Sequence, residues 1–459
     1  MNFQESIEYL YGLGNEVLAM KLGLENITKL LDALGNPQKN YLKIQIAGTN
    51  GKGSTVAFLE SICVSAGIKT GATTSPHLIS ITERVKIGGV EISEKDFANY
   101  ATIVRETSEK LVENFRFQIS NSKLENKESG IPNLKSEIFL ETVPTFFEQV
   151  TAIALLAFDD NKVELAILET GIGGRFDATT AANAEIVAIT PIDLDHQKIL
   201  GESLAEIAAE KAAIIRKDTK VFVAPQKKEV EKVIYGKCRE VQVEPTWATE
   251  IIETKVYSEE NYPIISTSFK TEKDNYSKVV LGLNGRHQFI NASLAIGIAE
   301  TLREFDFKIS NQDIWLGLET ARHRGRLEFY EGILFDGAHN VAGAIALREY
   351  LNEFINQPIT MIFGAMRDKN LTEIAQILFM KADKLIFTKP DNPRSMEMAE
   401  LLKFVPKNFD RENVIVTETV ADALNTAKKI TNENELILVT GSLYLVGEVQ
   451  KIMNNKSEI

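Results

Sequence analysis

Short apolar runs alternate with longer amphipathic stretches along residues 41–225 of this chain. Continuous apolar runs are typical of the strands of a parallel sheet that is covered by helices on both faces. We predict strands at residues 41–47, 163–168, 185–189 and 221–224, and a helix at residues 54–66. The first half of the chain is therefore predicted to form an α/β domain with a parallel sheet.

The pattern changes at about residue 241 and returns after Arg326. Between residues 241 and 283, β-branched and aromatic residues lie among short polar breaks, which favours antiparallel strands attached to the first domain. After Arg326 the apolar runs at 333–335, 360–363, 385–387, 414–416 and 436–439 again alternate with helical periodicity. The sequence therefore predicts a second, smaller α/β domain. The polar segment 120–135 is expected to be a surface insertion.

Length, charge and cysteine content narrow the class of protein. With 459 residues the chain is too long for one ordinary hydrophobic core, which agrees with two or three domains. The formal net charge of -13 and the lack of a basic tract argue against a nucleic-acid partner. Cys63 and Cys238 cannot form a disulfide framework, and Cys63 falls on the apolar stripe of the predicted helix. We see no signal peptide and no apolar run long enough to span a bilayer, so we expect a cytoplasmic protein without membrane association.

A glycine-rich loop follows the first predicted strand, with the sequence Gly48-Thr49-Asn50-Gly51-Lys52-Gly53-Ser54. Accessible backbone N–H groups, a lysine ammonium and a hydroxyl are the groups that bind polyphosphate with Mg²⁺. The spacing is shorter than in the usual phosphate-binding loop, and Gly53 separates Lys52 from Ser54. The loop predicts a nucleotide site, and a glycine-rich turn without a ligand is the alternative.

Polar side chains also follow two predicted strands that are consecutive along the chain. Glu169 ends one apolar run, and Asp195-His196 comes shortly after the next. Ligands bind at the carboxyl ends of parallel strands, so Glu169 and His196 are candidates for a metal ion beside the phosphates. A solvated carboxylate and a hydrogen-bonded structural histidine are the alternatives. Residues 171–176 lack the third glycine of a dinucleotide-binding fingerprint, so we do not predict one there.

Lys211 lies on the apolar stripe of a helix predicted over residues 202–217. A lysine that faces the interior must be paired or lose its proton, because burial penalises the charged form. A neutral amine can react with CO₂ to give a carbamate, which would add an anionic metal ligand. Periodicity alone favours the alternative, a lysine that snorkels past the stripe or pairs with neighbouring carboxylates.

The start of the second predicted domain carries a cluster of polar residues, Arg322-His323-Arg324-Gly325-Arg326 and Asp336-Gly337-Ala338-His339-Asn340. An arginine fork suits phosphate oxygens, and an Asp at a strand end can accept hydrogen bonds from ribose hydroxyls. On a separate domain, these groups would close over a nucleotide held by the first. A solvated linker followed by a turn is the alternative. The polar loops 366–370 and 388–394 are candidates for the same cleft, or ordinary connecting loops.

Together these segments resemble the folylpolyglutamate synthase and dihydrofolate synthase family, a branch of the Mur-ligase-like ATP-dependent amide ligases. The motifs that carry the resemblance occur in the same order at residues 48–54, 74–78, 83–84, 145–148, 173–179, 194–196, 210–212, 336–340 and 440–448. The shortened loop is this family's own version. The implied fold is α/β, with a P-loop parallel-sheet ATPase domain and a small antiparallel β addition over residues 1–321. A smaller Rossmann-like α/β domain would follow over residues 322–459.

The resemblance implies an enzyme that uses ATP to join the amino group of L-glutamate to a carboxylate on a pterin. The implied acceptors are dihydropteroate and reduced folates, and the implied cofactors are ATP and Mg²⁺. In that family the carboxylate first takes the γ-phosphoryl group, and the amine then displaces phosphate from the acyl phosphate. A carboxylate is inert to an amine until its oxygen becomes a good leaving group, and positioning with charge neutralisation supplies most of the catalysis. The family is usually monomeric.

The resemblance also assigns residues. Lys52, His196 and Lys211 are implied in catalysis, and Lys211 matches the family's carbamylated lysine, which reverses the preference drawn from periodicity. Mg²⁺ is expected at Ser75, Glu169 and His196. The nucleotide is expected at Gly51, Lys52, Gly53, Ser54, Asn291, Arg326 and Asp336, with Arg326 on phosphate and Asp336 on ribose. The pterin is expected at Lys21, Leu22, Gly23, Leu24, Thr145, Phe146, Phe147, Glu148, Phe176, Asp177 and Ala178.

The chain departs from the family's pattern at several positions. Arg324 stands where the family usually has Pro, Thr180 where it has Asn, and Lys21 where we expect an acidic residue beside the pterin. A ligase with only one of the two activities is the nearest alternative. A peptidoglycan-precursor ligase is disfavoured, because the roughly 40 residues before Tyr41 are too few for a uridine-nucleotide domain. A P-loop ATPase switch without ligase activity is the alternative from another class.

Overall fold

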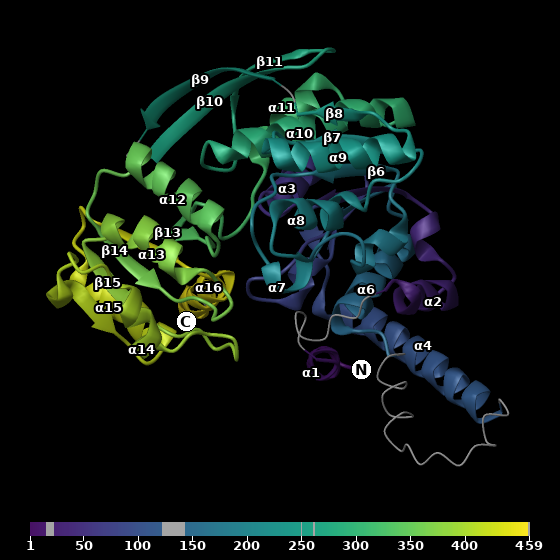
Figure 1. Cartoon of the computed structure of the whole chain (residues 1–459), viewed down its shortest axis with the longest axis horizontal. Coiled ribbons are helices and arrows are strands. Elements are labelled where there is room, and N and C mark those ends of the chain that lie inside the picture. Colours follow the sequence, from purple (N-terminus) through teal and green to yellow (C-terminus); the bar gives the residue numbers. More distant parts are fainter. Residues whose placement is uncertain (15–22, 122–142, 249, 260–261, 458–459) are drawn as a thin grey trace.

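The computed structural model describes residues 1–14, 23–121, 143–248, 250–259 and 262–457. A larger domain, coloured purple to teal, lies beside a smaller domain coloured green to yellow (Figure 1). The chain passes between them from the end of α11 (Asn311–Thr320) to β12 (Glu328–Tyr330). Most of the predicted surface insertion at residues 120–135 lies outside the described residues.

The larger domain is built on an eight-stranded sheet with the order β4-β3-β2-β5-β1-β6-β7-β8. The neighbouring strands β2, β5, β1, β6, β7 and β8 are parallel to one another. At one edge of the sheet, β3 pairs antiparallel with β2, and β4 pairs antiparallel with β3. Their bounds are β1 Leu42–Ala47, β2 Thr70–Thr73, β3 Lys86–Ile87, β4 Val90–Glu91, β5 Leu165–Glu169, β6 Ile186–Ile189, β7 Lys220–Val223 and β8 Pro245–Trp247. The four strands predicted from the apolar runs correspond to β1, β5, β6 and β7.

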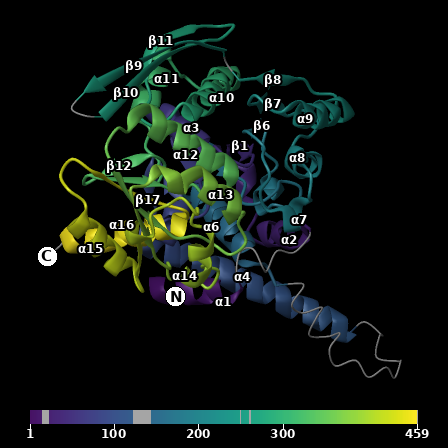
Figure 2. The same ribbon diagram turned by 60° about the vertical axis from the view of Figure 1, so that its left-hand side comes forward.

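Helices cover both faces of this sheet, which explains the continuous apolar sequences of its strands. In β5, Leu165 and Ile167 join the core beneath α3, whereas Ala166 and Leu168 join the core beneath α6. One face carries α3 (Lys52–Ser65), α10 (His287–Leu302) and α11. The other carries α2 (Glu25–Ala33), α4 (Glu94–Asn121), α6 (Phe146–Asp160), α8 (Leu204–Ala212) and α9 (Lys228–Val241). In Figure 2, α4 projects from the body of the molecule. Among the described residues, this domain also contains the α-helices α1 (Phe3–Gly12) and α7 (Gln197–Leu200).

A separate three-stranded antiparallel sheet, in the order β11-β10-β9, packs on α10 and α11. Its strands are β9 Glu250–Glu259, β10 Tyr262–Lys270 and β11 Asn275–Val280, which confirms the antiparallel strands predicted between residues 241 and 283. One strand in that range, β8 at Pro245–Trp247, is parallel to its neighbour and not antiparallel as predicted. Since α9 returns the chain to the sheet edge, β8 pairs in parallel with β7 and extends the large sheet.

The smaller domain has a six-stranded sheet with the order β12-β13-β17-β14-β15-β16, in which only β12 is antiparallel. Its other strands are β13 Ile333–Asp336, β14 Ile359–Phe363, β15 Lys384–Phe387, β16 Val414–Val416 and β17 Leu436–Thr440. One face packs against α12 (Val341–Phe354), α13 (Leu371–Leu378) and α14 (Met398–Leu401), and the other against α15 (Val420–Ile430) and α16 (Leu443–Ser457). This confirms the second α/β domain.

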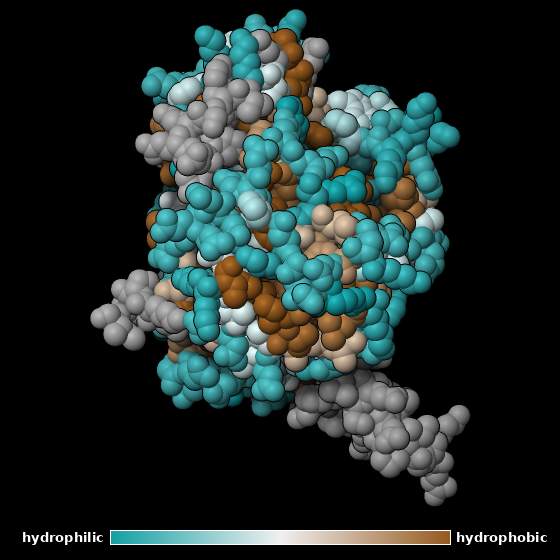
Figure 3. Space-filling model, turned by 90° about the vertical axis from the view of Figure 1, so that its left-hand side faces the viewer, coloured by the Kyte–Doolittle hydropathy of each residue, from teal (hydrophilic) through white to brown (hydrophobic). Residues whose placement is uncertain are grey.

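Short 3₁₀ helices complete the described structure, at Pro37–Lys39, Ile81–Arg84, Ala178–Ala182, Arg303–Phe305, Phe379–Lys381, Leu402–Phe404 and Arg411–Asn413. The face of the molecule on the side of the smaller domain is largely hydrophilic, with apolar residues exposed in part of it (Figure 3). Within the described residues, no helix combines the length and apolar character needed to cross a bilayer.

Candidate active site

Two adjoining cavities lie between the domains, at the carboxyl ends of the parallel strands. The larger cavity, of about 360 Å³, is lined by the first turn of α10, by the first half of α12 and by the glycine-rich loop at residues 48–54. We call this loop the phosphate loop, after the function predicted for it. The smaller cavity, of about 170 Å³, is lined by the first turn of α6 and by loops of both domains. Ser75, His196 and His339 are among the residues that line both. This is the edge at which α/β folds bind ligands.

The phosphate loop turns from β1 directly into α3, so the amino end of α3 faces the larger cavity. Gly51 has a φ of 89°, and a Cβ at this position would collide with the side chain of Asn291. Only glycine therefore allows the loop to pass so close to α10. The first N–H groups of a helix have no partner within the helix and favour anions.

Ser54 is held by residues from outside the loop. Its Oγ accepts a hydrogen bond from Gln288 Nε2 at 3.3 Å and lies 3.2 Å from His323 Nδ1. Asn291 Nδ2 in turn donates to Gln288 Oε1 at 2.8 Å. The first turn of α10 and the connection between the domains therefore both contact the predicted nucleotide-binding loop.

Lys52 and Glu169 lie close together because β1 and β5 are neighbours in the sheet. Burial lowers the pKa of Lys52, and the carboxylates of Glu169 and Asp195 oppose that shift. Burial likewise raises the pKa of Glu169, and Lys52 opposes it. Each group therefore favours the charged form of the other.

The three predicted metal-binding residues Ser75, Glu169 and His196 all line the larger cavity. Glu169 Oε2 accepts a hydrogen bond from the Ser75 N–H at 3.0 Å, and burial lowers the pKa of His196 to about 4. Nowhere in the described part of the chain do three or more His, Cys, Asp or Glu residues gather to hold a metal ion. Mg²⁺ is commonly held by one or two carboxylates together with phosphate oxygens and water, so these residues fit Mg²⁺ that arrives with a nucleotide.

Lys211 faces the interior, as its place on the apolar stripe allows. Its side chain lines the larger cavity, the residue is 5% exposed, and Nζ donates to the Gly48 carbonyl oxygen at 2.7 Å. Burial lowers the pKa of Lys211 to about 7, and the ammonium of Lys52 adds to this shift. A substantial fraction of the amine is therefore neutral near pH 7, which is the form that reacts with CO₂.

From the smaller domain, Arg326 and Asp336 line the larger cavity, as predicted. Asp336 accepts hydrogen bonds from the N–H groups of Leu327 at 3.0 Å and Ala338 at 2.9 Å. Burial raises its pKa to about 6, and Arg326 opposes the shift. Arg322, from the same polar cluster, donates hydrogen bonds to the backbone carbonyl oxygens of Glu319 and Ala321 and is not among the residues that line the two cavities.

Asp195 joins the two domains beside His196. Its Oδ1 accepts from Lys369 Nζ at 2.7 Å, and its Oδ2 accepts from Asn340 Nδ2 at 3.1 Å. The same amide of Asn340 donates to Asn50 Oδ1 in the phosphate loop at 2.9 Å. Burial alone would raise the pKa of Asp195, but the Lys369 ammonium holds it well below its usual range. The smaller domain therefore contacts the phosphate loop and the loop of His196 together.

The first turn of α6 forms one wall of the smaller cavity. Thr145 and Glu148 cap this helix reciprocally, and Glu148 also accepts a hydrogen bond from the Ile27 N–H of α2 at 3.2 Å. Phe146 stacks on the Tyr11 ring at 5.5 Å, and the Arg84 guanidinium lies 5.4 Å from its centre. These contacts fix the wall from several directions.

Asp177 fixes the loop after β5. Its carboxylate accepts hydrogen bonds from the N–H groups of Gly171, Ile172 and Thr179 and from the Thr179 hydroxyl. Phe176 and Ala178 line the smaller cavity on either side of it. Of the N-terminal residues predicted to bind the pterin, Gly23 lines this cavity and Leu24 packs against the hydrophobic core. Lys21 and Leu22 lie outside the described residues.

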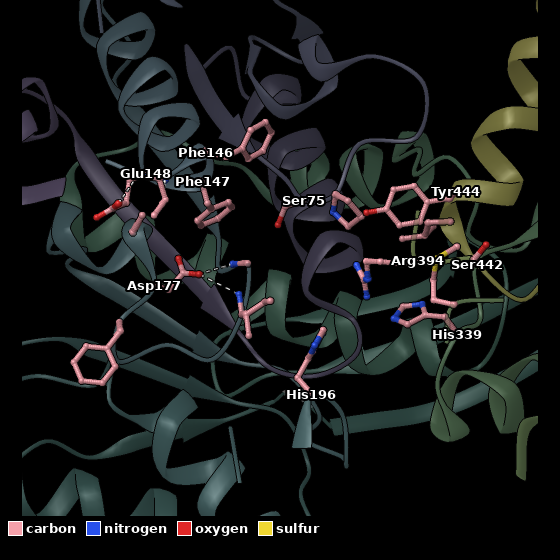
Figure 4. A pocket seen from close by; sticks show the side chains of 18 of the residues that line it. Ser75, Phe146, Phe147, Glu148, Asp177, His196, His339, Arg394, Ser442 and Tyr444 are labelled. Atoms are coloured by element: carbon pink, nitrogen blue, oxygen red, sulfur yellow. Dashed lines mark hydrogen bonds between the residues drawn. The ribbon is translucent and has the colours of Figure 1, made fainter. Parts of the chain in front are cut away.

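The opposite wall of the smaller cavity belongs to the smaller domain. Figure 4 shows Phe146, Phe147, Glu148 and Asp177 on one side, and His339, Arg394, Ser442 and Tyr444 on the other. Lys369 and Arg394 come from the two polar loops proposed for this cleft. Sequence reasoning missed Gln288 as a site residue, although it lies three positions before Asn291 on one face of α10. The sequence marked Asp195 and His323 as members of polar clusters, but nothing local indicated that Asp195 bonds to Lys369 and Asn340 or that His323 lies beside Ser54.

Comparisons with known proteins agree with this arrangement. A family model described as the C-terminal domain of dihydrofolate synthetase matches residues 326–452. The chain is 32% identical to a Bacillus subtilis dihydrofolate synthase/folylpolyglutamate synthase, over 98% of each sequence. It superimposes with a TM-score of 0.85 on Mycobacterium tuberculosis folylpolyglutamate synthase complexed with ADP, at 26% identity over 98% of each chain. E. coli FolC in complex with DHPP and ADP gives a TM-score of 0.80 at 26% identity, covering 100% of this chain and 99% of that one.

The two-domain α/β fold, with a phosphate loop facing a cavity between the domains, defines an ATP-dependent ligase of the Mur-ligase type. The match to the Bacillus subtilis sequence, at 32% identity over 98% of both chains, identifies the family within this class of ligases. The chain belongs to the dihydrofolate synthase/folylpolyglutamate synthase family.

Proposed function

We propose that this enzyme adds L-glutamate both to dihydropteroate and to reduced folates, with ATP activating the acceptor carboxylate. The observation that carries the proposal is that the phosphate-loop cavity and the smaller cavity share a wall at Ser75 and His196. A carboxylate in the smaller cavity would therefore lie beside phosphates in the larger one. Among the solved relatives, Mycobacterium tuberculosis folylpolyglutamate synthase is complexed with ADP and E. coli FolC with both DHPP and ADP, which supports a site that takes a second ligand together with a nucleotide.

In the proposed site the nucleotide phosphates bind to the amino end of α3, Lys52 and Ser54, and Arg326 reaches them from the smaller domain. Asp336 binds the ribose, and Asn291 contacts the nucleotide from α10. Fixed N–H groups and cations stabilise the charge that develops during phosphoryl transfer without reorganising at that moment. Ser75, Glu169 and His196 would hold Mg²⁺, which when bound neutralises part of the phosphate charge.

The acceptor would bind in the smaller cavity, with its ring system against Phe146, Phe147 and Phe176. The oxygen of its carboxylate attacks the γ-phosphorus, ADP leaves, and an acyl phosphate remains. The glutamate amine then attacks the carbonyl carbon, and phosphate leaves as the amide forms. The cationic side chains of Lys369 and Arg394, on the wall that the smaller domain provides, suit a dicarboxylate such as glutamate. We further propose that the enzyme acts as a monomer, because residues of one chain line both cavities, and that it acts in the cytoplasm, as the sequence led us to expect.

A phosphate-release assay tests the proposed reaction. With ATP and Mg²⁺ present, dihydropteroate, tetrahydrofolate and L-glutamate are added singly and in pairs. We expect sustained release only when glutamate and one of the two acceptors are present together, because the acyl phosphate is consumed only by the amine. Chromatography of the products would show the added glutamate.

The same assay separates the alternatives. Release with ATP alone, unaffected by pterin or glutamate, would show an ATPase without ligase activity. Sustained release with only one acceptor would show a single-activity ligase and would contradict the bifunctional proposal.

Glu169→Gln tests the proposed metal site. The substitution keeps the shape of the side chain but removes the charge, so we expect the Mg²⁺ concentration for half-maximal turnover to rise about tenfold or more. Titration of turnover with MgCl₂ at fixed ATP measures it. Glu164→Gln is the matched control, because Glu164 precedes β5 at the end away from the site and is exposed. An unchanged Mg²⁺ dependence in the Glu169 variant would exclude it as a ligand.

A further inference from the structure

The walls of the larger cavity include two helices that belong to different domains. On one side lies the first turn of α10, and on the other the first half of α12. The lining residues are His287, Gln288, Ile290 and Asn291 from α10, and Ala342, Gly343, Ala346 and Leu347 from α12. The width of this cavity therefore depends on how far apart the two domains hold these helices.

One ion pair connects these helices directly. Arg286 immediately precedes α10, and Glu353 lies in the last turn of α12. Arg286 Nε donates to Glu353 Oε2 at 2.7 Å, and Nη2 donates to Oε1 at 2.6 Å. Two parallel bonds between a planar guanidinium and a carboxylate fix orientation as well as distance. Neither side chain is among the residues that line the described cavities, so the pair acts on them from outside.

Neighbouring contacts strengthen this connection. Phe354, next to Glu353, packs against the core of the larger domain and also against the core of its own domain. At the opposite end of α12, the capping residue Asn340 donates to Asn50 in the phosphate loop. The helix α12 is thus attached to the larger domain at both ends, and its cavity-facing residues lie near the end that Asn340 caps.

We propose that Arg286 and Glu353 are positioning residues for the nucleotide, and that their ion pair sets the spacing of α10 and α12 across the larger cavity. This inference rests on the proposed function, in which that cavity binds ATP. Because helices are rigid, a change in the distance between α10 and α12 at the ion pair also changes the distance between the residues of these helices that line the cavity. Arg286 is 51% and Glu353 33% exposed at the side chain, so the pair is screened by salt and its effect is moderate.

The test compares Arg286→Gln, Glu353→Gln and the charge-exchanged double variant Arg286→Glu/Glu353→Arg. We expect each single variant to raise the Kd for ADP and the KM for ATP about two- to fivefold, the range that an exposed ion pair supports. We expect kcat to change less than the KM, because neither side chain touches the reacting groups. The double variant should recover most of the affinity, and the differences should shrink in 1 M salt. Titration calorimetry with ADP measures binding without turnover.

Arg105→Gln is the matched control. Arg105 forms an exposed ion pair with Glu109 at 2.7 Å, but both residues lie within α4 of one domain. Arg286→Lys retains the charge without the planar fork and should give an intermediate affinity. Unchanged ADP affinity in both single variants would overturn the inference. A double variant that folds but does not recover ADP affinity would also overturn it. A wild-type protein that does not bind ADP would instead overturn the proposed function.

Discussion

Lys52→Ala is expected to lower kcat/KM for ATP by about 10²–10³-fold, the loss found when one preorganised electrostatic group is removed from a reaction centre. Lys52 is the first residue of α3 and lines the larger cavity, and the carboxylates of Glu169 and Asp195 oppose the lowering of its pKa by burial. Its ammonium is therefore fixed where the charge of transferred phosphate would develop. Truncation leaves Glu169 without this compensating charge, which further disfavours an anionic ligand.

The measurement is phosphate release at saturating acceptor and glutamate, combined with ADP calorimetry. Lys228→Ala is the control, because Lys228 is an exposed lysine in the first turn of α9 and is not among the residues that line the cavities. Thermal unfolding should show that the Lys52 variant remains folded. Activity within a few-fold of wild type would contradict the assignment of Lys52 to the phosphates.

Lys211→Ala is expected to reduce turnover by about 10²-fold or more while the fold stays intact. We propose that Lys211 carries the carbamate that the family resemblance implies, which would add negative charge to the metal site, and alanine removes both the amine and the charge. The stability loss should be modest, about 1–3 kcal/mol, because the substitution leaves the buried Gly48 carbonyl oxygen without its lysine donor. A structural lysine would instead lower stability and leave turnover largely unchanged.

Rescue and pH dependence distinguish these roles of Lys211. A short added carboxylate, such as acetate, should restore part of the activity of Lys211→Ala, whereas Lys211→Arg should remain inactive because guanidinium does not form the carbamate. Wild-type turnover should rise as the pH passes upward through about 7, since deprotonation produces the amine that reacts with CO₂. Bicarbonate should enhance wild-type turnover near pH 7, because it supplies the CO₂ that reacts with the amine. Carbamate formation would be contradicted if CO₂ removal had no effect at any pH.

The strands and the glycine-rich loop of this protein could be predicted from its sequence, because each depends on a local pattern of residues. Strands buried on both faces need continuous apolar runs, so β1, β5, β6 and β7 were predicted close to their observed bounds. The phosphate loop needs glycine where the backbone turns into α3. Helical periodicity placed Lys211 on an apolar stripe but by itself favoured a snorkelling or paired lysine, and the structure shows that Lys211 is buried. Ordered motifs then indicated the family, and the comparisons confirmed it.

Contacts between distant segments were not accessible in this way. The sequence marked residues 322–326 as one polar cluster, whereas the structure shows the Arg322 guanidinium bonded to the carbonyl oxygens of Glu319 and Ala321, near its own helix end. The prediction missed β8, because the register of an edge strand depends on where α9 returns the chain. The resemblance assigned Leu24 to the pterin, and the structure adds that Leu24, directly before α2, packs in part against the hydrophobic core.

The sequence by itself determined the two α/β domains, the phosphate loop and the family, because these depend on local periodicity, on glycine at tight turns and on ordered motifs. Only the tertiary structure decided that Ser54 meets Gln288, that Asp195 meets Lys369 across 174 residues of chain, and that Arg286 meets Glu353. Such contacts depend on how two separately packed cores are oriented, and residue spacing along the chain contains no information about that orientation.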